Sequence, residues 1–386
     1  MDVVFLFMSQ SSASPNSTPN DWKADSPCGD YYNDHFAGEG YFKQLANLRQ
    51  RGVIKNLSVF YESNKAPGYA NWIKEADCQV IPEIRFVDKY IKKDTIIYVR
   101  GGFKHWHDFL LKYKGNNWLM LYAANTGRQR WTWWDIVLND LKIVNYVDSK
   151  QRYWHHFIKP IDETMFYPDY NVFDPIYDIC IGASHIHDRK GQWRTVKVMQ
   201  AYKDIYNVNL KAIMPGSFRR STETLKMIPE LEKLNIEMPG MLPRHQLNKI
   251  FNTSKYFIHL GAHGQNDRGP LEALSCGTPV ILGSPEYHAE LMHNDNSITF
   301  IPKDINDFEG TAKYLHILLQ KWQSCFKEEV VKKYKQKLSF EKSCDRMKSL
   351  LTMMYVLKKP TLDNKERIRA AFDVIDSNDQ WYLDIN

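Results

Sequence analysis

The chain has little that would mark it as a disulfide-stabilised or zinc-binding protein. It contains six cysteines, and no two of them are separated by only two residues. Disulfide frameworks in small secreted domains and zinc sites both depend on cysteines at characteristic short spacings. We therefore interpret the six as free thiols, most of them in the core.

Long hydrophobic runs are also missing. The apolar stretch Val3–Met8 is far shorter than the roughly 20 residues that span a bilayer, and it follows an aspartate and not a basic segment. This pattern is typical of a strand and not of a secretory signal. We expect a soluble cytoplasmic protein, in the host cytoplasm if the source is a virus or phage.

Neither sign of charge dominates. The net charge is +6 over 386 residues, with 25% charged and 43% hydrophobic residues, which excludes wholesale disorder. A mild positive charge is compatible with an anionic substrate or with nucleic acid and is specific for neither. Aromatic residues are more unusual, with 11 tryptophans and 22 tyrosines. Many lie between Trp106 and Trp154, either as core or as platforms for sugars or bases.

Short apolar runs alternate with helical patterns, which predicts an α/β fold with parallel sheets. Near the start, strands are expected at 2–8, 57–61, 95–100 and 118–123, and helices at 40–50, 133–139 and 150–157. A break at 171–175 precedes a second such pattern, which ends in long helices at 305–322 and 327–351. We predict two doubly wound Rossmann-like domains, 1–172 and 173–355, that face an interdomain cleft, and a tail, 356–386, that packs back on the first domain.

The most informative segment follows an apolar strand and a loop of small residues. From Pro270 to Ile281 it reads Pro-Leu-Glu-Ala-Leu-Ser-Cys-Gly-Thr-Pro-Val-Ile. Pro270 is suited to the first turn of a helix, whose free N–H groups attract a phosphate. We expect Glu272 in that first turn, where its carboxylate can accept hydrogen bonds from two ribose hydroxyls.

This segment resembles the donor-binding signature of the retaining GT-B glycosyltransferases. The resemblance implies a hexosyl- or pentosyltransferase that moves a sugar from a nucleotide-diphosphate sugar to an acceptor hydroxyl with retention of configuration. Gly264 stands where the family has its first glutamate, so Gln265, Asn266, Asp267 or backbone amides would replace that contact. The implied donor-binding residues are Gly38, Gly40, Gly182, Lys190, Arg219, Gly264, Gln265, Asn266, Gly269, Pro270, Leu271 and Glu272.

The resemblance also implies roles for basic residues. Arg189 and Lys190 would neutralise the donor diphosphate and, with Glu272, form the catalytic set. No Asp-x-Asp pair stands in a suitable loop, so we expect no metal and no cofactor. Acceptor candidates lie in the first half of the chain: His105, His107, Asn125, Arg128, Arg130 and Trp131.

The acceptor is left open by the sequence. A saccharide, a lipid-linked sugar or a small molecule fits the resemblance. Basic and aromatic residues at 125–134 also suit hydroxymethylated bases of phage or viral duplex DNA. From other classes, a sugar-nucleotide epimerase shares this fold, and the loss of a glutamate at Gly264 is compatible with a non-catalytic relic.

Overall fold

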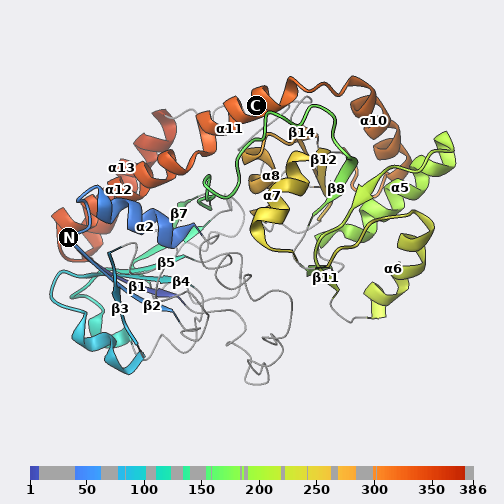
Figure 1. Ribbon diagram of the computed structural model, residues 1–386. Coiled ribbons are helices and arrows are strands. Elements are labelled where there is room, and N and C mark those ends of the chain that lie inside the picture. Colours follow the sequence, from blue (N-terminus) through green and yellow to red (C-terminus); the bar gives the residue numbers. More distant parts are fainter. Residues whose placement is uncertain are drawn as a thin grey trace. The chain divides into compact units, whose positions relative to one another are not determined.

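The computed structural model describes residues 1–7, 40–61, 77–82, 84–100, 110–122, 134–139, 154–157, 159–182, 185–186, 190–218, 222–240, 242–261, 268–283, 299–300 and 302–378. The chain forms two compact units (Figure 1). The first comprises Met1–Pro160 together with Phe340–Asn386, and the second comprises Ile161–Ser339. Within the described residues, no helix combines the length and apolarity that crossing a membrane requires.

The first unit is built on a seven-stranded sheet whose strands are all parallel. Its spatial order is β3-β2-β1-β4-β5-β6-β7, so the direction of winding reverses between β1 and β4. The strands are β1 (Asp2–Phe7), β2 (Asn56–Tyr61), β3 (Gln79–Val80), β4 (Ile96–Arg100), β5 (Leu119–Tyr122), β6 (Ile136–Asn139) and β7 (Trp154–His156).

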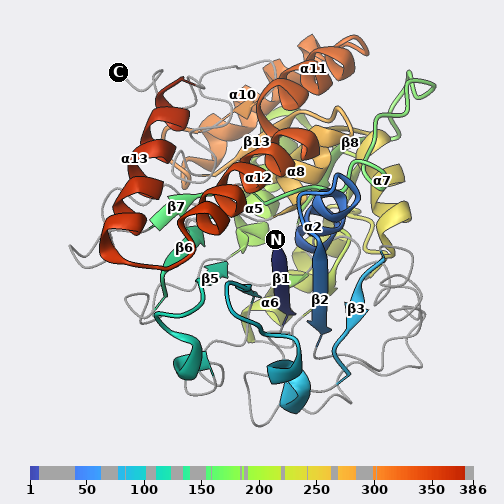
Figure 2. The same cartoon turned by 90° about the vertical axis from the view of Figure 1, so that its left-hand side faces the viewer.

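Alternating side chains of this sheet feed two apolar layers, as the period of a strand requires. Val3 and Phe5 belong to one cluster, and Val4 and Leu6 belong to the other. The first cluster includes residues of α2 (Tyr41–Gln50), α12 (Phe340–Leu357) and α13 (Leu362–Asn378) (Figure 2). The second includes residues of the 3-10 helix η3 (Ile84–Lys89) and Leu110, which precedes η4 (Leu111–Tyr113).

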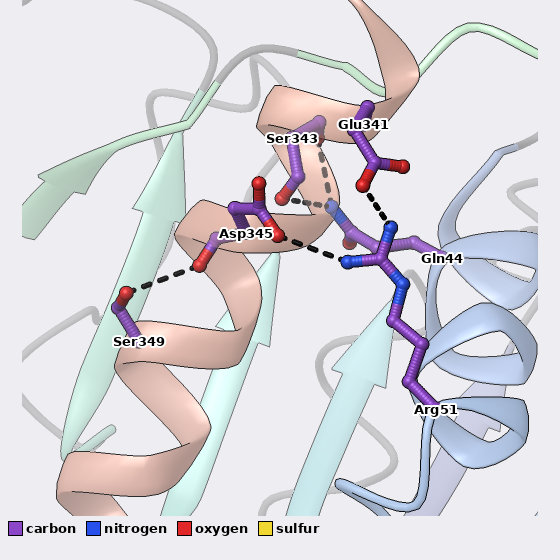
Figure 3. A network of polar contacts seen from close by, with 6 residues as sticks. All are labelled: Gln44, Arg51, Glu341, Ser343, Asp345 and Ser349. Atoms are coloured by element: carbon purple, nitrogen blue, oxygen red, sulfur yellow. Dashed lines mark hydrogen bonds and ion pairs between the residues drawn. The ribbon is translucent and has the colours of Figure 1, made fainter.

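Polar contacts fix α12 on α2 (Figure 3). Gln44, which is buried, donates its side-chain amide to the carbonyl and the hydroxyl of Ser343, both at 2.8 Å. Arg51, at the end of α2, lies between Asp345, at 2.9 Å, and Glu341. These contacts join segments almost 300 residues apart, so the C-terminal helices complete the core of the first unit.

The second unit has a five-stranded parallel sheet in the order β10-β8-β12-β13-β14. The strands are β8 (Tyr177–Ile181), β10 (Ala212–Ile213), β12 (Ser254–His259), β13 (Val280–Leu282) and β14 (Thr299–Phe300), and β9 (His185–Ile186) pairs separately with β11 (Ser217–Phe218). The helices are α5 (Gln192–Tyr206), α6 (Thr222–Lys233), α7 (Arg244–Asn252), α8 (Arg268–Ser275), α10 (Phe308–Lys321) and α11 (Phe326–Leu338).

Helices cover both faces of this second sheet. Ile179, Ile181 and Ile258 join residues of α5, α6 and α10 in one apolar cluster. On the other face, the ring of Phe257 meets Phe251 of α7 edge-on, with centroids 5.6 Å apart. Both units are therefore doubly wound α/β structures, which confirms the predicted fold class.

Two predicted helices are wrong. Residues 133–139 and 150–157 were expected to be helical, but they contain the parallel strands β6 and β7. From Ile136 to Leu138 the side chains are buried on both faces of the sheet. A strand of this kind reads as a continuous apolar run, whose periodicity does not distinguish it from a buried helix.

The boundaries between the units also differ from the expected 172/173 and 355/356. The chain divides after Pro160 and after Ser339. The single helix expected at 327–351 is two helices, because Ser339 has an extended ψ of 149° that ends α11. Beyond this break, α12 packs on α2, and α13 contributes Ile368 and Phe372 to the same core. The end of the chain, including Trp381, lies outside the described residues.

Candidate active site

In the second unit, the winding reverses between β8 and β12. Ligands of open α/β sheets bind outside the carboxyl ends of the strands at such a switch point. Here Gly182 directly follows β8 and Leu260 directly follows β12, and the amide of Gly182 donates to the carbonyl of Ile258 at 3.0 Å. Helix α5 comes after β8 in the sequence, and α8 comes after β12. The amino ends of both helices therefore lie near the carboxyl edge of this sheet.

Glycines allow close backbone packing at this edge. Gly191 has φ +76°, and a Cβ there would lie 2.1 Å from the carbonyl group of Leu260. A Cβ on Gly182 would lie 1.9 Å from the ring of Phe257. A Cβ on Gly269, in the first turn of α8, would lie 3.0 Å from the same ring. Gly182 and Gly269, which were predicted to contact the donor, thus have packing reasons for lacking a side chain.

The amino end of α5 is positively charged. The half-buried Lys190 precedes Gly191, and the helix has neither a side-chain cap nor an acidic residue in its first turn. Its free N–H groups favour an anion. Arg194 lies one turn further, where it donates to the carbonyl of Leu260 at 3.4 Å and to Asn306 at 3.3 Å. Burial lowers the pKa of Arg194 from its ordinary value.

Helix α8 begins earlier than the sequence indicated. It starts at Arg268, so Glu272 lies in the second turn and not in the first. Pro270 is the third residue of the helix, where its missing N–H breaks no intrahelical bond. Pro270, Leu271 and Glu272 are all buried. Leu271 and Pro270 therefore serve packing, and Glu272 needs a partner because an isolated buried carboxylate is costly.

That partner is Arg244, the first residue of α7. Its Nη1 donates to Oε1 of Glu272, and the two side chains are only 8% and 5% exposed. The guanidinium also lies over the ring of Phe166, with its carbon 5.6 Å from the ring centroid. Burial strengthens this charge-assisted contact and makes either partner costly to remove.

A hydrogen-bond network holds α7 and α8 in register around this pair. Ser275 donates to the carbonyl of Phe166 at 2.7 Å. Asn248, on α7, accepts from the Tyr167 amide at 3.2 Å and from the Cys276 thiol at 3.1 Å. Segment 161–170, α7 and α8 thus form one polar-linked layer on this face of the sheet. Burial raises the pKa of Cys276 well above its ordinary value, so this thiol is structural.

The first unit has its own switch point, between β1 and β4. Arg100 ends β4 beside Phe7 of β1 and is 9% exposed, with its guanidinium carbon 5.6 Å from the ring centroid of Tyr41. Gly40 caps α2 with φ +75°, and a Cβ there would lie 1.9 Å from the carbonyl oxygen of Pro160. Gly40 is thus required by packing, whatever its relation to a ligand.

Many predicted site residues lie outside the described residues: Gly38, His105, His107, Asn125, Arg128, Arg130, Trp131, Arg189, Arg219, Gly264, Gln265 and Asn266. The β9–β11 ladder pairs Ile186 with Phe218. It therefore brings together two strands that directly precede the segments of Arg189 and Arg219. Trp134, by contrast, is 3% exposed in the core of the first unit and is no surface platform.

Sequence reasoning did not single out three cations: Arg100 at the end of β4, Arg194 beside Leu260, and Arg244 beside Glu272. Arg100 was seen only as part of a strand and Arg194 as part of a helix. Arg244 was not singled out within 240–247, a segment that resembles the one framing the base pocket in the family. A lone arginine in an apolar strand is the signal that could have identified Arg100, since buried charges are rarely without function or partner. Within the described residues, no cluster of three or more metal-binding side chains occurs.

Comparison with known proteins adds to this picture. No protein-family model matches the sequence, and no curated protein matches it significantly. Solved structures do match. A glycosyltransferase from Rickettsia africae is 11% identical, with a TM-score of 0.63, and 92% of this chain and 98% of that one are covered.

Two further solved structures match over a similar share of this chain. Anabaena HepE in complex with UDP is 10% identical with a TM-score of 0.61, covering 91% of this chain and 100% of its own. Sucrose-phosphate synthase from Thermosynechococcus elongatus is 12% identical with a TM-score of 0.62, covering 92% and 100%. At these identities the likeness concerns the fold, and it extends over nearly the whole chain. The chain therefore has the GT-B fold of these glycosyltransferases.

Proposed function

We propose that this protein is a glycosyltransferase that moves a sugar from a nucleotide-diphosphate sugar to an acceptor hydroxyl. The observation that carries the proposal is the location of the segment Pro270–Ile281, which resembles a donor-binding signature. It forms α8 and β13 in the unit whose switch point lies between β8 and β12. Sequence motif and sheet topology thus independently favour the same edge of the second unit.

The nucleotide is proposed to bind at this edge with its ribose at Glu272. A carboxylate accepts hydrogen bonds from two vicinal hydroxyls, and its burial keeps water from competing. HepE has been solved with UDP and with UDP-glucose. Uridine nucleotides are therefore the first donors to test. Arg219 is proposed to lie near the nucleotide as well.

Catalysis is proposed to rest on electrostatic stabilisation of the leaving group. The bond between the anomeric carbon and the diphosphate breaks, and the acceptor oxygen bonds to the same face of the sugar, so that configuration is retained. The acceptor proton passes to the departing phosphate oxygen. Arg189, Lys190 and the free N–H groups of α8 would stabilise the negative charge that grows there. This set needs no metal ion.

The sugar itself is proposed to contact the residues that precede α8 in the sequence. Gly264 offers no side chain there, so Gln265, Asn266 and backbone amides would hold the sugar hydroxyls. Amides donate and accept hydrogen bonds, whereas a glutamate only accepts. We therefore expect a different sugar preference from that of enzymes with a glutamate at this position.

The acceptor is proposed to bind in the first unit, at the carboxyl edge of its sheet. Arg100 and Tyr41 lie at the switch point of this sheet. A buried guanidinium over an aromatic ring suits an acceptor with an anionic or sugar group. The predicted acceptor residues His105, His107, Asn125, Arg128, Arg130 and Trp131 belong to the same unit. Saccharides, lipid-linked sugars and small molecules remain the proposed classes.

The proposal is tested with a panel of nucleotide sugars. Ligand binding to the native state raises the melting temperature, so a thermal-shift screen identifies the donor. Transfer and hydrolysis are then followed with candidate acceptors, and NMR of the product gives the anomeric configuration. Sugar isomerisation without an acceptor would favour the epimerase alternative, and binding without turnover would favour the relic.

Glu272→Ala is the sharpest variant for the donor site. Losing a charged hydrogen bond costs about 1.5–3 kcal/mol, so donor affinity should fall roughly 10- to 150-fold. Glu309→Ala is the matched control, because the Glu309 side chain is 75% exposed on α10. Unchanged affinity in a folded Glu272→Ala protein would contradict the donor assignment.

A further inference from the structure

The proposed function uses Glu272 but gives no role to its ion-pair partner, Arg244. The pair joins the amino end of α7 to the second turn of α8 across 28 residues of sequence. Both side chains are more than nine-tenths buried. A buried ion pair loses most of its Coulombic gain to desolvation, so it is a poor device for stability alone. A role beyond stability therefore accounts better for two charges buried at this position.

The contacts of the pair determine which carboxylate oxygen is available. Arg244 binds Oε1 of Glu272, and among the described residues no hydrogen bond reaches Oε2. The guanidinium lies over the ring of Phe166, which restricts where it can move. Phe166 is itself held by the Ser275 hydroxyl on its carbonyl, and its ring lies 6.0 Å from that of Phe251. Arg244 thus holds one oxygen of the carboxylate. Its guanidinium lies against Phe166, which is linked to α8 through Ser275 and to α7 through Phe251.

We propose that Arg244 is a positioning residue for nucleotide recognition. By holding Oε1, it orients the carboxylate of Glu272 so that Oε2 meets the ribose hydroxyls of the donor. It also balances the charge of a carboxylate that burial would otherwise disfavour. This inference rests on the proposed function and deepens it, because it names the residue that makes Glu272 competent. Arg244 itself touches no substrate in this scheme.

A purely structural role for Arg244 makes a different prediction. If the pair only holds α7 against α8, its loss would weaken every nucleotide to the same extent. If it aims the carboxylate, its loss would weaken only ligands that carry ribose hydroxyls. Comparing a nucleoside diphosphate with its 2′,3′-dideoxy form separates the two roles, because the two ligands share base and phosphates.

The experiment measures dissociation constants by calorimetry for the full chain. UDP, GDP and ADP are tested first, and the tightest is compared with its 2′,3′-dideoxy analogue. The proteins are wild type, Arg244→Met, Arg244→Lys and Glu272→Gln, with Glu309→Gln as an exposed control. Circular dichroism checks that each variant is folded.

Wild type should prefer the hydroxylated diphosphate by about tenfold or more, as expected for a charged hydrogen bond. Arg244→Met should reduce this preference to less than about threefold and leave the affinity for the dideoxy form unchanged. Arg244→Lys should restore part of the preference, because it returns the charge without the planar fork. Glu272→Gln should resemble Arg244→Met.

Two results would overturn the inference. One is a folded Arg244→Met protein that keeps the wild-type preference, and the other is equal weakening of both ligands. If Arg244→Met does not fold, Arg244→Lys decides, and an unchanged preference there would overturn the inference as well. Failure of the proposed function would be visible in wild type itself, as no diphosphate binding or no preference for ribose hydroxyls, and the inference would fall with it.

Discussion

His155 should make the stability of the first unit depend on pH. This residue lies in β7, is 5% exposed, and packs against Phe372 of α13 with ring centroids 5.1 Å apart. Burial, together with the nearby positive charges of Arg346 and Arg369, lowers the pKa of His155 from 6.5 to about 3. The folded protein therefore keeps this imidazole neutral where the unfolded chain would protonate it.

The sign and size of the effect follow from proton linkage. Because the folded pKa lies below the unfolded one, the contribution is complete above pH 6.5 and is lost as pH falls toward 3. Each pH unit below 6.5 costs about 1.4 kcal/mol, so roughly 2 kcal/mol is lost at pH 5. For a unit of this size, that corresponds to a fall in melting temperature of roughly 4–8 °C.

Scanning calorimetry at pH 7 and pH 5 measures this effect. His155→Leu removes the titrating group, so its melting temperature should fall less between the two pH values than that of wild type. His245→Asn, at an exposed position of α7, is the control and should keep the wild-type difference. If the unfolding shows two transitions, His155→Leu should change the pH dependence only of the transition that belongs to the first unit. Equal pH dependence in wild type and His155→Leu would refute the reasoning.

Other changes have equally definite outcomes. Lys365 of α13 lies 2.5 Å from Asp135, a buried carboxylate whose pKa burial raises. Lys365→Met should therefore destabilise the first unit by about 3–5 kcal/mol in urea unfolding; adding Asp135→Asn should restore most of that loss, and no restoration would contradict a charge effect. Lys190→Ala should lower kcat more than donor affinity, since leaving-group charge grows in the transition state; an unaffected kcat would place the diphosphate contact elsewhere. If duplex DNA is the acceptor, Arg128→Ala with Arg130→Ala should flatten the salt dependence of DNA binding by about 0.9 in log–log slope per lost phosphate contact, and an absence of salt-dependent binding in wild type would exclude DNA.

Much of the local structure around the motif could be predicted from the sequence. The contiguous segment Pro270–Ile281 indicated a helix with Glu272 near its start and a following strand, and the structure has α8 and β13 there. Lys190 was predicted to contact the donor diphosphate, and in the structure it lies two residues before the start of α5. Contacts of this kind are local, because a helix start and its neighbouring charges are set by a few adjacent residues.

What the sequence by itself determined is therefore the α/β class and the position of the motif, because both depend on short-range periodicity. Only the tertiary structure decided that β6 and β7 are strands, that the chain crosses back at Ser339, and that Arg244 pairs with Glu272. These features depend on which surfaces bury one another. The apolar face of α12 is satisfied by α2 almost 300 residues away, and a single sequence carries no record of that partner.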